Sequence, residues 1–213
     1  MTTRKTIALI ALCAAVLAAP SPLRGQVGKG LVDFNTATDK ELAALPHFTP
    51  ATVKSVIDKR PFPSIVDVST LLTTFGITPA QTTEIYEKAF VTLNLNNCTP
   101  AEIGSIPRAR QMVREFPEYR PWKNWAQFDK EIGKYVGQTP GELERLKQYV
   151  FIPLDLNTAT DEAFMTIPGV GARMVREFKE YRPWKSKEQF EKEIGKYVDA
   201  KEVARLWRYM TIQ

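Results

Sequence analysis

The chain repeats itself, and this repetition restricts its fold more than any other feature of the sequence. Residues 112–136 and 174–198 are identical at 20 of 25 positions, which chance does not produce. A third, more diverged copy precedes them, since the run that begins at Asn35 returns at Asn96 and at Asn157, in steps of 61 residues. Self-similarity at a fixed period indicates a repeat architecture. We therefore expect three tandem units near residues 31–92, 93–153 and 154–213.

Helix start signals occur at the same place in each unit. Thr38 with Glu41, and Thr99 with Glu102, have the spacing of a capping box, in which the two side chains satisfy free backbone amides. In the third unit Thr160 is a suitable N-cap. These signals predict that the first helix of each unit begins directly after the threonine.

The remaining pattern predicts about four short helices in each unit. Apolar residues recur at helical spacing, and Arg182-Pro183 ends the second helix of the third unit, because proline has no backbone donor. No segment alternates apolar and polar residues over the length of a strand. We therefore expect an all-α fold without a sheet, arranged as a rod-like or gently bent array in which neighbouring units support each other.

The first residues have the organisation of a secretory signal peptide. Arg4 and Lys5 form a short positive region, the segment 6–19 is uncharged and almost wholly apolar, and Ala18 offers a small residue for cleavage. The apolar stretch is short for a membrane span, although an uncleaved anchor remains the alternative. We assign residues 1–25 to the signal peptide and expect an exported protein, periplasmic or at the cell surface.

Charge and cysteine content say little about the function of the chain. The net charge of +5 falls to +3 when Arg4 and Lys5 leave with the signal peptide, which is too little to indicate nucleic-acid binding by itself. Beyond that segment Cys98 is the only thiol, so no intramolecular disulfide is expected. Since alanine occupies the same position in the other units, we expect Cys98 to be a small buried side chain.

The third unit carries a more specific set of motifs. They are Asn157-Thr158-Ala159, the hairpin Ile167-Pro168-Gly169-Val170-Gly171, the helix end Tyr181-Arg182, and Pro183-Trp184-Lys185-Ser186. With these motifs the unit resembles the helix-hairpin-helix module of ComEA-type competence proteins. The resemblance extends over all three units and is strongest in the third. It implies three tandem helix-hairpin-helix modules and a role in binding DNA outside the cytoplasmic membrane during uptake.

The chemistry of this hairpin supports anion binding independently. Glycines allow close approach of the backbone, and free amides at a helix start favour a phosphate. We expect Gly169, Val170, Gly171 and Ala172 to contact DNA phosphates through the main chain, with Arg173 and Arg176 adding charge. Such contacts position a protein on DNA without reading bases, so binding is expected to be independent of sequence.

The other two hairpins depart from this pattern. The second, Ile106-Pro107-Arg108-Ala109-Arg110, is one residue shorter and lacks both glycines, so we expect Arg108 and Arg110 to supply side-chain charge instead. The first, at residues 45–49, also lacks glycine. Residues 32–92 hold five Lys or Arg and seven acidic residues. The first unit is therefore not expected to bind DNA, and a spacer or a protein-docking role remains open.

The remaining conspicuous residues have structural interpretations. Trp122 and Trp184 are expected to pack in the core. The basic residues near the C-terminus alternate with glutamates, which is typical of a solvated helix face; they are Lys192, Lys196, Lys201, Arg205 and Arg208. His47 is the sole histidine and has no partner ligands for a metal.

These observations leave two function classes. No set of nucleophile, base and orienting group occurs, so we expect no catalytic residues, metal or cofactor. The first class is an exported protein that binds duplex DNA for uptake or retention. The alternative is a protein-interaction or scaffold module of an envelope secretion or pilus-like assembly.

Overall fold

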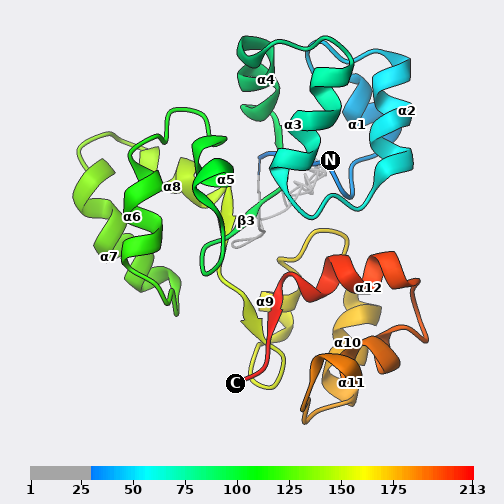
Figure 1. Ribbon diagram of the computed structural model, residues 1–213. Helices are drawn as coiled ribbons and strands as arrows, with labels where there is room; N and C mark the ends of the chain where they lie inside the picture. The colour runs from blue at the N-terminus through cyan, green and yellow to red at the C-terminus, as the bar shows by residue number, and fades with distance from the viewer. Residues whose placement is uncertain (1–29) are drawn as a thin grey trace, which may run out of the picture.

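The chain folds into three units, each of which begins and ends with a strand and holds four helices in between (Figure 1). The computed structural model describes residues 30–213, so the expected signal peptide lies outside the described residues. The first unit contains β1 (Val32–Asp33), α1 (Asp39–Ala43), α2 (Pro50–Lys59), α3 (Ile65–Thr74), α4 (Pro79–Tyr86) and β2 (Ala89–Phe90). The second contains β3 (Leu93–Asn94), α5 (Pro100–Gly104), α6 (Met112–Glu118), α7 (Trp125–Val136), α8 (Glu142–Lys147) and β4 (Val150–Phe151). The third contains β5 (Leu154–Asp155), α9 (Asp161–Phe164), α10 (Ala172–Glu180), α11 (Lys187–Ile194), α12 (Ala200–Trp207) and β6 (Met210–Thr211).

The fold is mainly helical, but the expectation that it lacks any sheet is wrong. The first and last strands of each unit pair in parallel, with Val32 opposite Ala89, Leu93 opposite Val150, and Leu154 opposite Met210. Each strand is only two residues long. A strand of this length cannot show an alternating pattern, because one period of alternation already spans two residues.

The helix starts agree with the sequence. Thr38 and Thr99 each form the complete capping box with Glu41 and Glu102, and Thr160 accepts a hydrogen bond from the amide of Ala163. These caps satisfy amides that have no partner within the helix. The first helix of each unit is therefore fixed by its own local sequence.

The repeated asparagine and the repeated Arg-Pro-aromatic motif hold each unit together. In the third unit, the side chain of Asn157 donates to the carbonyl of Trp184 at 3.0 Å and accepts from the amide of Trp184 at 2.7 Å. Arg182 donates to the carbonyls of Leu156 and Ala159 at 2.7 and 2.6 Å. Equivalent asparagine pairs join residues 35 to 62 and residues 96 to 122. The motifs shared by all three units are thus engaged in the fold itself.

The tryptophans that follow these prolines are core residues. Trp122 and Trp184 are each 2% exposed. Their indole nitrogens donate to the carbonyls of Phe116 and Phe178 at 2.8 and 2.6 Å, so the buried polar atom is satisfied. This confirms that they pack in the interior. Cys98 is also buried, at 4% exposure, and burial raises the pKa of its thiol.

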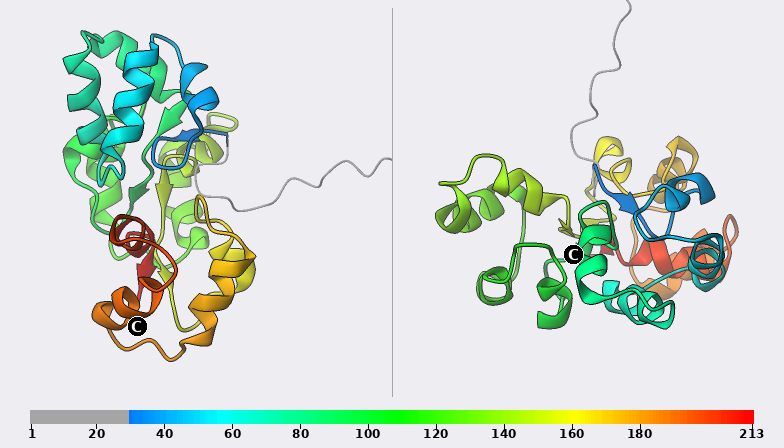
Figure 2. Two further views of the ribbon diagram at one scale, coloured as in Figure 1. Left: turned by 90° about the vertical axis from the view of Figure 1, so that its right-hand side faces the viewer. Right: turned by 90° about the horizontal axis from the view of Figure 1, so that it is seen from above.

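The units do not form a rod, because the first and third units touch (Figures 1 and 2). The guanidinium of Arg208 donates to the carbonyl of Thr92 at 3.0 Å, and the hydroxyl of Tyr209 lies 3.4 Å from that of Thr92. The methyl group of Thr36 lies 3.3 Å from where a Cβ of Gly169 would be. The chain therefore folds back on itself. In Figure 1 the first and third units lie on the right, the second unit lies on the left, and the short sheets lie between them.

Candidate nucleic-acid interface

The turn between the first two helices has the same backbone conformation in all three units. Its central residue is His47, Arg108 or Gly169, with φ values of 63°, 57° and 77°. The next amide closes each turn; in the third unit the amide of Val170 donates to the carbonyl of Ile167 at 3.1 Å. A left-handed conformation favours glycine. The turn nevertheless keeps its shape where glycine has been replaced.

The expected role of Val170 is therefore corrected. Its amide is used inside the turn, and its side chain is only 9% exposed. Gly169 and Gly171 are both exposed. Only Gly169 has a positive φ, whereas Gly171 has φ −114° and no heavy atom within 4 Å of a Cβ placed on it. The amides that remain for a ligand are those at the start of α10.

The start of α10 differs from that of every other long helix in residues 30–213. Six helices of eight or more residues, α2, α3, α4, α7, α11 and α12, have a side chain that accepts from a first-turn amide. The nine-residue α10 has Gly171 at its N-cap and no such side chain. Its first residues, Ala172 and Arg173, are exposed. Uncapped amides at the positive end of a helix form a favourable position for an anion.

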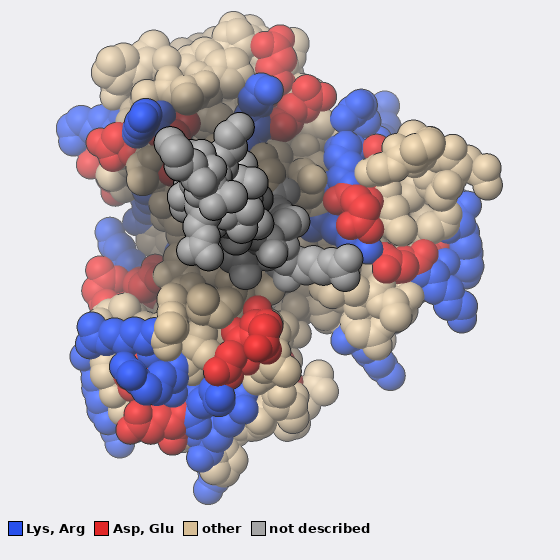
Figure 3. Space-filling view, turned by 180° about the vertical axis from the view of Figure 1, so that it is seen from behind, with Lys and Arg blue, Asp and Glu red and all other residues tan. Residues whose placement is uncertain are grey.

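Two exposed arginines extend from the same helix. The guanidinium of Arg173 lies 5.9 Å from the ring centre of Tyr197, and no ion pair of Arg173 occurs in the described part of the chain. The side chain of Arg176 is 69% exposed and lies 3.9 Å from the carboxylate of Glu177. Both charges are accessible to a phosphate. Basic and acidic side chains are mixed on the surface of the third unit (Figure 3).

The second hairpin provides side-chain charge but a poorer helix start. The helix α6 begins at Met112 after Gln111, which supplies no side-chain cap, and it is seven residues long. Met112 corresponds to Met174, the third residue of α10, so the deleted residue falls between the turn and the helix. Arg108 is 68% exposed and lies 4.0 Å from Glu87, and Arg110 is exposed. Within residues 30–213, no ion pair or hydrogen bond joins either arginine to the third hairpin.

The first hairpin has a different environment. The ring of His47 is 2.7 Å from a carboxylate oxygen of Glu84 and 3.3 Å from the side-chain nitrogen of Gln81, both on α4. An acidic group therefore stands beside this turn. A negative charge at this position is unfavourable for a phosphate.

Arg205 was assigned wrongly from the sequence. It is only 3% exposed, and its guanidinium pairs with both carboxylate oxygens of Glu202 at 2.7 and 2.6 Å. Burial acts to lower the pKa of Arg205, but the hydrogen bonds and charge of Glu202 more than offset this effect and raise it. The sequence signal was the Glu-x-x-Arg spacing, which recurs as Glu142 and Arg145 with the same paired geometry.

A neighbouring carboxylate, Asp33, faces this arginine from the first unit. Burial raises the pKa of Asp33, and hydrogen bonds from the amides of Asn35 and Thr36 together with the charges of Arg205 and Arg208 oppose that rise. One oxygen of Asp33 is buried without a hydrogen-bond partner in the described structure. The contact between the first and third units therefore contains charged groups that are incompletely paired.

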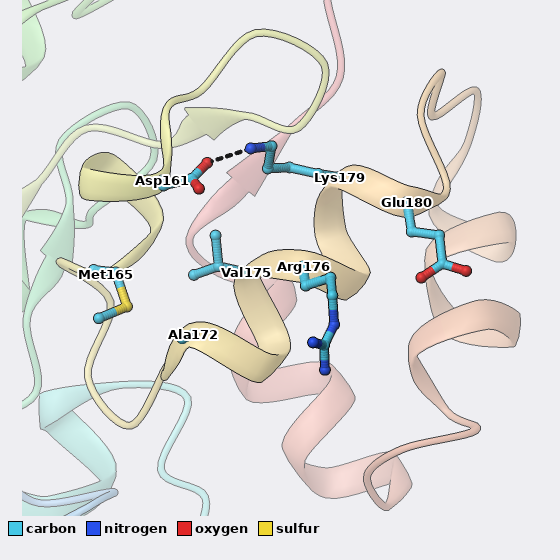
Figure 4. A pocket seen from close by; sticks show the side chains of 7 residues that line it. All are labelled: Asp161, Met165, Ala172, Val175, Arg176, Lys179 and Glu180. Carbon is cyan, nitrogen blue, oxygen red and sulfur yellow. Dashed lines mark ion pairs between the residues drawn. The ribbon is translucent and has the colours of Figure 1, made fainter.

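A groove of about 620 Å³ runs beside α10 (Figure 4). Met165, directly after α9, is 43% exposed there, and Lys179 pairs with Asp161 at 2.7 Å across one side. The residues of the first unit that correspond to the lining of this groove line a second groove, of about 700 Å³, between α1 and α2. Because the groove occurs in both a glycine-containing and a glycine-free unit, we attribute it to the way these two helices cross.

Comparison with known proteins adds nothing to this geometry. Neither family models, nor curated proteins, nor solved structures gave a match to the chain. Within residues 30–213, none of the helices combines the length and apolar character needed to cross a membrane.

Proposed function

We propose that this protein is an exported, non-catalytic DNA-binding protein built from three helix-hairpin-helix modules of the ComEA-like kind. The observation that carries the proposal is the uncapped, exposed start of α10. Its amides at Gly171, Ala172 and Arg173 are free to hold a phosphate oxygen, and Arg176 adds charge on the same helix. The contacts are to the phosphate backbone, so the protein binds duplex DNA without sequence preference.

The second unit contributes less in this proposal. Arg108 and Arg110 provide charge. However, one residue is missing between the turn and α6, and α6 is shorter than α10 and begins at the position of the third residue of α10. The first unit contributes nothing directly, since Glu84 stands beside its turn. Binding is therefore weak and serves uptake or retention of extracellular DNA.

Fluorescence polarisation with a random-sequence duplex tests the proposal. If two or three phosphates are neutralised, raising the salt from about 50 to about 200 mM weakens binding about 12- to 40-fold. Two duplexes of unrelated sequence are expected to bind equally. Absence of binding by the folded wild-type protein at the lower salt contradicts the proposal.

Export is proposed from the leader alone. The expected mature terminus lies between Ala19 and Val27. Mass spectrometry of the native protein checks this, and an intact Met1 or Thr2 in a soluble cytoplasmic fraction contradicts it.

One observation favours the second candidate function, a protein-interaction module of an envelope secretion or pilus-like assembly. Residues 61–83 contain a single charged residue, Asp67, and its carboxylate is used in the capping box of α3. Val66 and Phe75 in this stretch are each 38% exposed. Figure 3 shows an uncharged upper edge on the first unit. A chain that fails to bind DNA at low salt favours this function.

A further inference from the structure

Consecutive units meet at two joints that are built alike. At each joint a two-residue link, Val91-Thr92 or Ile152-Pro153, connects the last strand of one unit to the first strand of the next. The first strands of the first and second units carry Asp33 and Asn94 at the same position, two residues before the repeated asparagine. The two joints can therefore be compared residue by residue.

The joint between the first and second units is filled by side chains of the third unit. The guanidinium of Arg208 donates to the carbonyl of Thr92 at 3.0 Å, and the hydroxyl of Tyr209 lies 3.4 Å from that of Thr92. The charges of Arg205 and Arg208 also act on Asp33. In this joint, cationic groups from another part of the chain thus face the link and the strand residue.

The joint between the second and third units is open. A cleft of about 510 Å³ lies there, and its lining includes Asn94 and Pro153, the counterparts of Asp33 and Thr92. Apolar side chains form part of its wall; they are Trp122, Ile152 and Met210. The described residues therefore leave at the second joint a space whose counterpart at the first joint is occupied.

The charge of the open joint is opposite to that of the filled one. Asn94 carries a neutral amide where Asp33 carries a carboxylate, and Lys123 stands where the first unit has Pro63. Lys123 is exposed and is the single charged residue among those that line the cleft. It forms no ion pair with a side-chain or terminal carboxylate in the described part of the chain. A joint that faces cations in the first case offers a cation in the second, so it suits an anionic group.

We propose that the cleft between the second and third units binds a carboxylate side chain of an acidic peptide segment in a partner protein. Lys123 supplies the charge, and the side-chain amide of Asn94 supplies a neutral donor. A phosphate backbone is bound through several cations, whereas the cleft offers one ammonium group beside an apolar wall. This combination favours a peptide over a nucleic acid. The inference goes beyond the proposed function and does not rest on DNA binding at the third hairpin.

The test is a titration of the ¹⁵N-labelled full chain with an acetylated and amidated tetraglutamate peptide, followed by NMR. In the wild type we expect saturable shifts of the side-chain amide of Asn94 and of the backbone amide of Thr211, which also lines the cleft. K123Q is expected to weaken peptide binding about fivefold or more, because a bond between charged groups is lost. K185Q removes the same charge from the corresponding exposed position of the third unit, which does not line the cleft, and serves as the matched control.

A second variant gives the open joint the carboxylate of the filled one. N94D is expected to weaken peptide binding, because the new charge repels the ligand. The fold accepts aspartate here, since Asp33 and Asp155 occupy this position in the other two units. Peptide binding by K123Q or N94D equal to that of K185Q overturns the inference, as does an Asn94 side-chain resonance that does not respond to the peptide.

Two further results identify a different occupant. If the chain without peptide sediments as a dimer that K123Q dissociates, the occupant is a second copy and the inference is wrong. If K123Q weakens binding of duplex DNA more than K185Q does, the cleft belongs to a nucleic-acid surface and the inference is also wrong. Failure of the peptide titration alone leaves the DNA proposal standing, because the third hairpin does not line the cleft.

Discussion

Replacing Gly171 tests the DNA proposal most directly, because this residue controls the start of α10 without being needed by the fold. Its φ of −114° is accessible to any residue, and a Cβ placed on it meets no heavy atom within 4 Å. Strain from a side chain therefore arises at Gly169, with φ 77°, and not at Gly171. Three variants, G171A, G171S and G171D, are all expected to fold.

The three variants separate three effects on phosphate binding. Alanine adds only a Cβ, and we expect its affinity for DNA to stay within about twofold of wild type. Serine also caps the helix and occupies an amide, which removes a bond to a charged group worth about 1.5–3 kcal/mol, or about tenfold or more in affinity. Aspartate adds a repulsion of about 1 kcal/mol at 4 Å in water, and more where the site is shielded from water. G171D is thus expected to bind about a hundredfold more weakly.

The stability of these variants changes in the opposite direction. Serine and aspartate are better N-caps than glycine by a few tenths of a kcal/mol, so both are expected to unfold at a slightly higher urea concentration. Loss of DNA affinity together with a gain in stability cannot be attributed to unfolding. This combination distinguishes a blocked site from a damaged fold.

The assay is fluorescence polarisation at about 50 mM salt, with circular dichroism and urea unfolding as the folding controls. R173A is measured in parallel and is expected to weaken binding less than G171D, because it removes one of several contacts. Should G171D bind duplex DNA as tightly as G171A, the hairpin is not the site, and the protein-interaction function becomes the better proposal.

Other predictions concern the fold. N157A removes two hydrogen bonds to Trp184 and is expected to lower the free energy of unfolding by about 1–3 kcal/mol in urea, whereas N97A, at an exposed position, should change it by no more than about 0.5 kcal/mol. Burial raises the pKa of Asp33 in the folded state above its ordinary 3.8. The stabilisation linked to this group is therefore fully present below about pH 3.8 and is lost as the pH rises through the pKa of the folded state. D33N is expected to reduce this fall in stability, and an unchanged pH profile of thermal unfolding contradicts the assignment. A fragment of residues 154–213 loses the contacts to Thr92 and is expected to melt below the full chain; equal melting temperatures mean that the units are independent.

Local features of the fold could be predicted from the sequence. The capping boxes at Thr38 and Thr99 depend on residues three positions apart, and both occur as expected. The burial of Trp122 and Trp184 followed from aromatic residues after a helix-ending proline. In these cases the partners lie close together in the chain.

Features that depend on distant residues could not be predicted in the same way. The strand pairs join residues 57 positions apart or nearly so, as in Val32 and Ala89, and each strand is too short to carry a periodic signal. The contact between the first and third units brings Thr36 against Gly169, and nothing in either local sequence indicates it. Tertiary contacts of this kind are fixed by shape and packing after the helices have formed.

Within the candidate site, the sequence located the hairpin but not its chemistry. It treated the glycines as equivalent, whereas only Gly169 requires a glycine conformation. It also placed Arg205 on a solvated face, because basic residues alternate with glutamates in this part of the chain. Arg205 is buried here because α12 packs beside the turn, where its guanidinium lies against Gly169.

The pattern of sequence differences among the units separates structural from chemical roles. All three keep the asparagine and the Arg-Pro-aromatic motif, whose atoms are engaged in the fold. The turn keeps a positive φ with histidine, arginine or glycine, so its shape does not dictate its residue. What changes from unit to unit is the pair formed by the turn residue and a charged neighbour: His47 contacts Glu84, Arg108 lies 4.0 Å from Glu87, and Gly169 lies beside Arg205. Since this pair sets the charge and the access at each hairpin, differences in binding among the units are to be sought there and not in the scaffold.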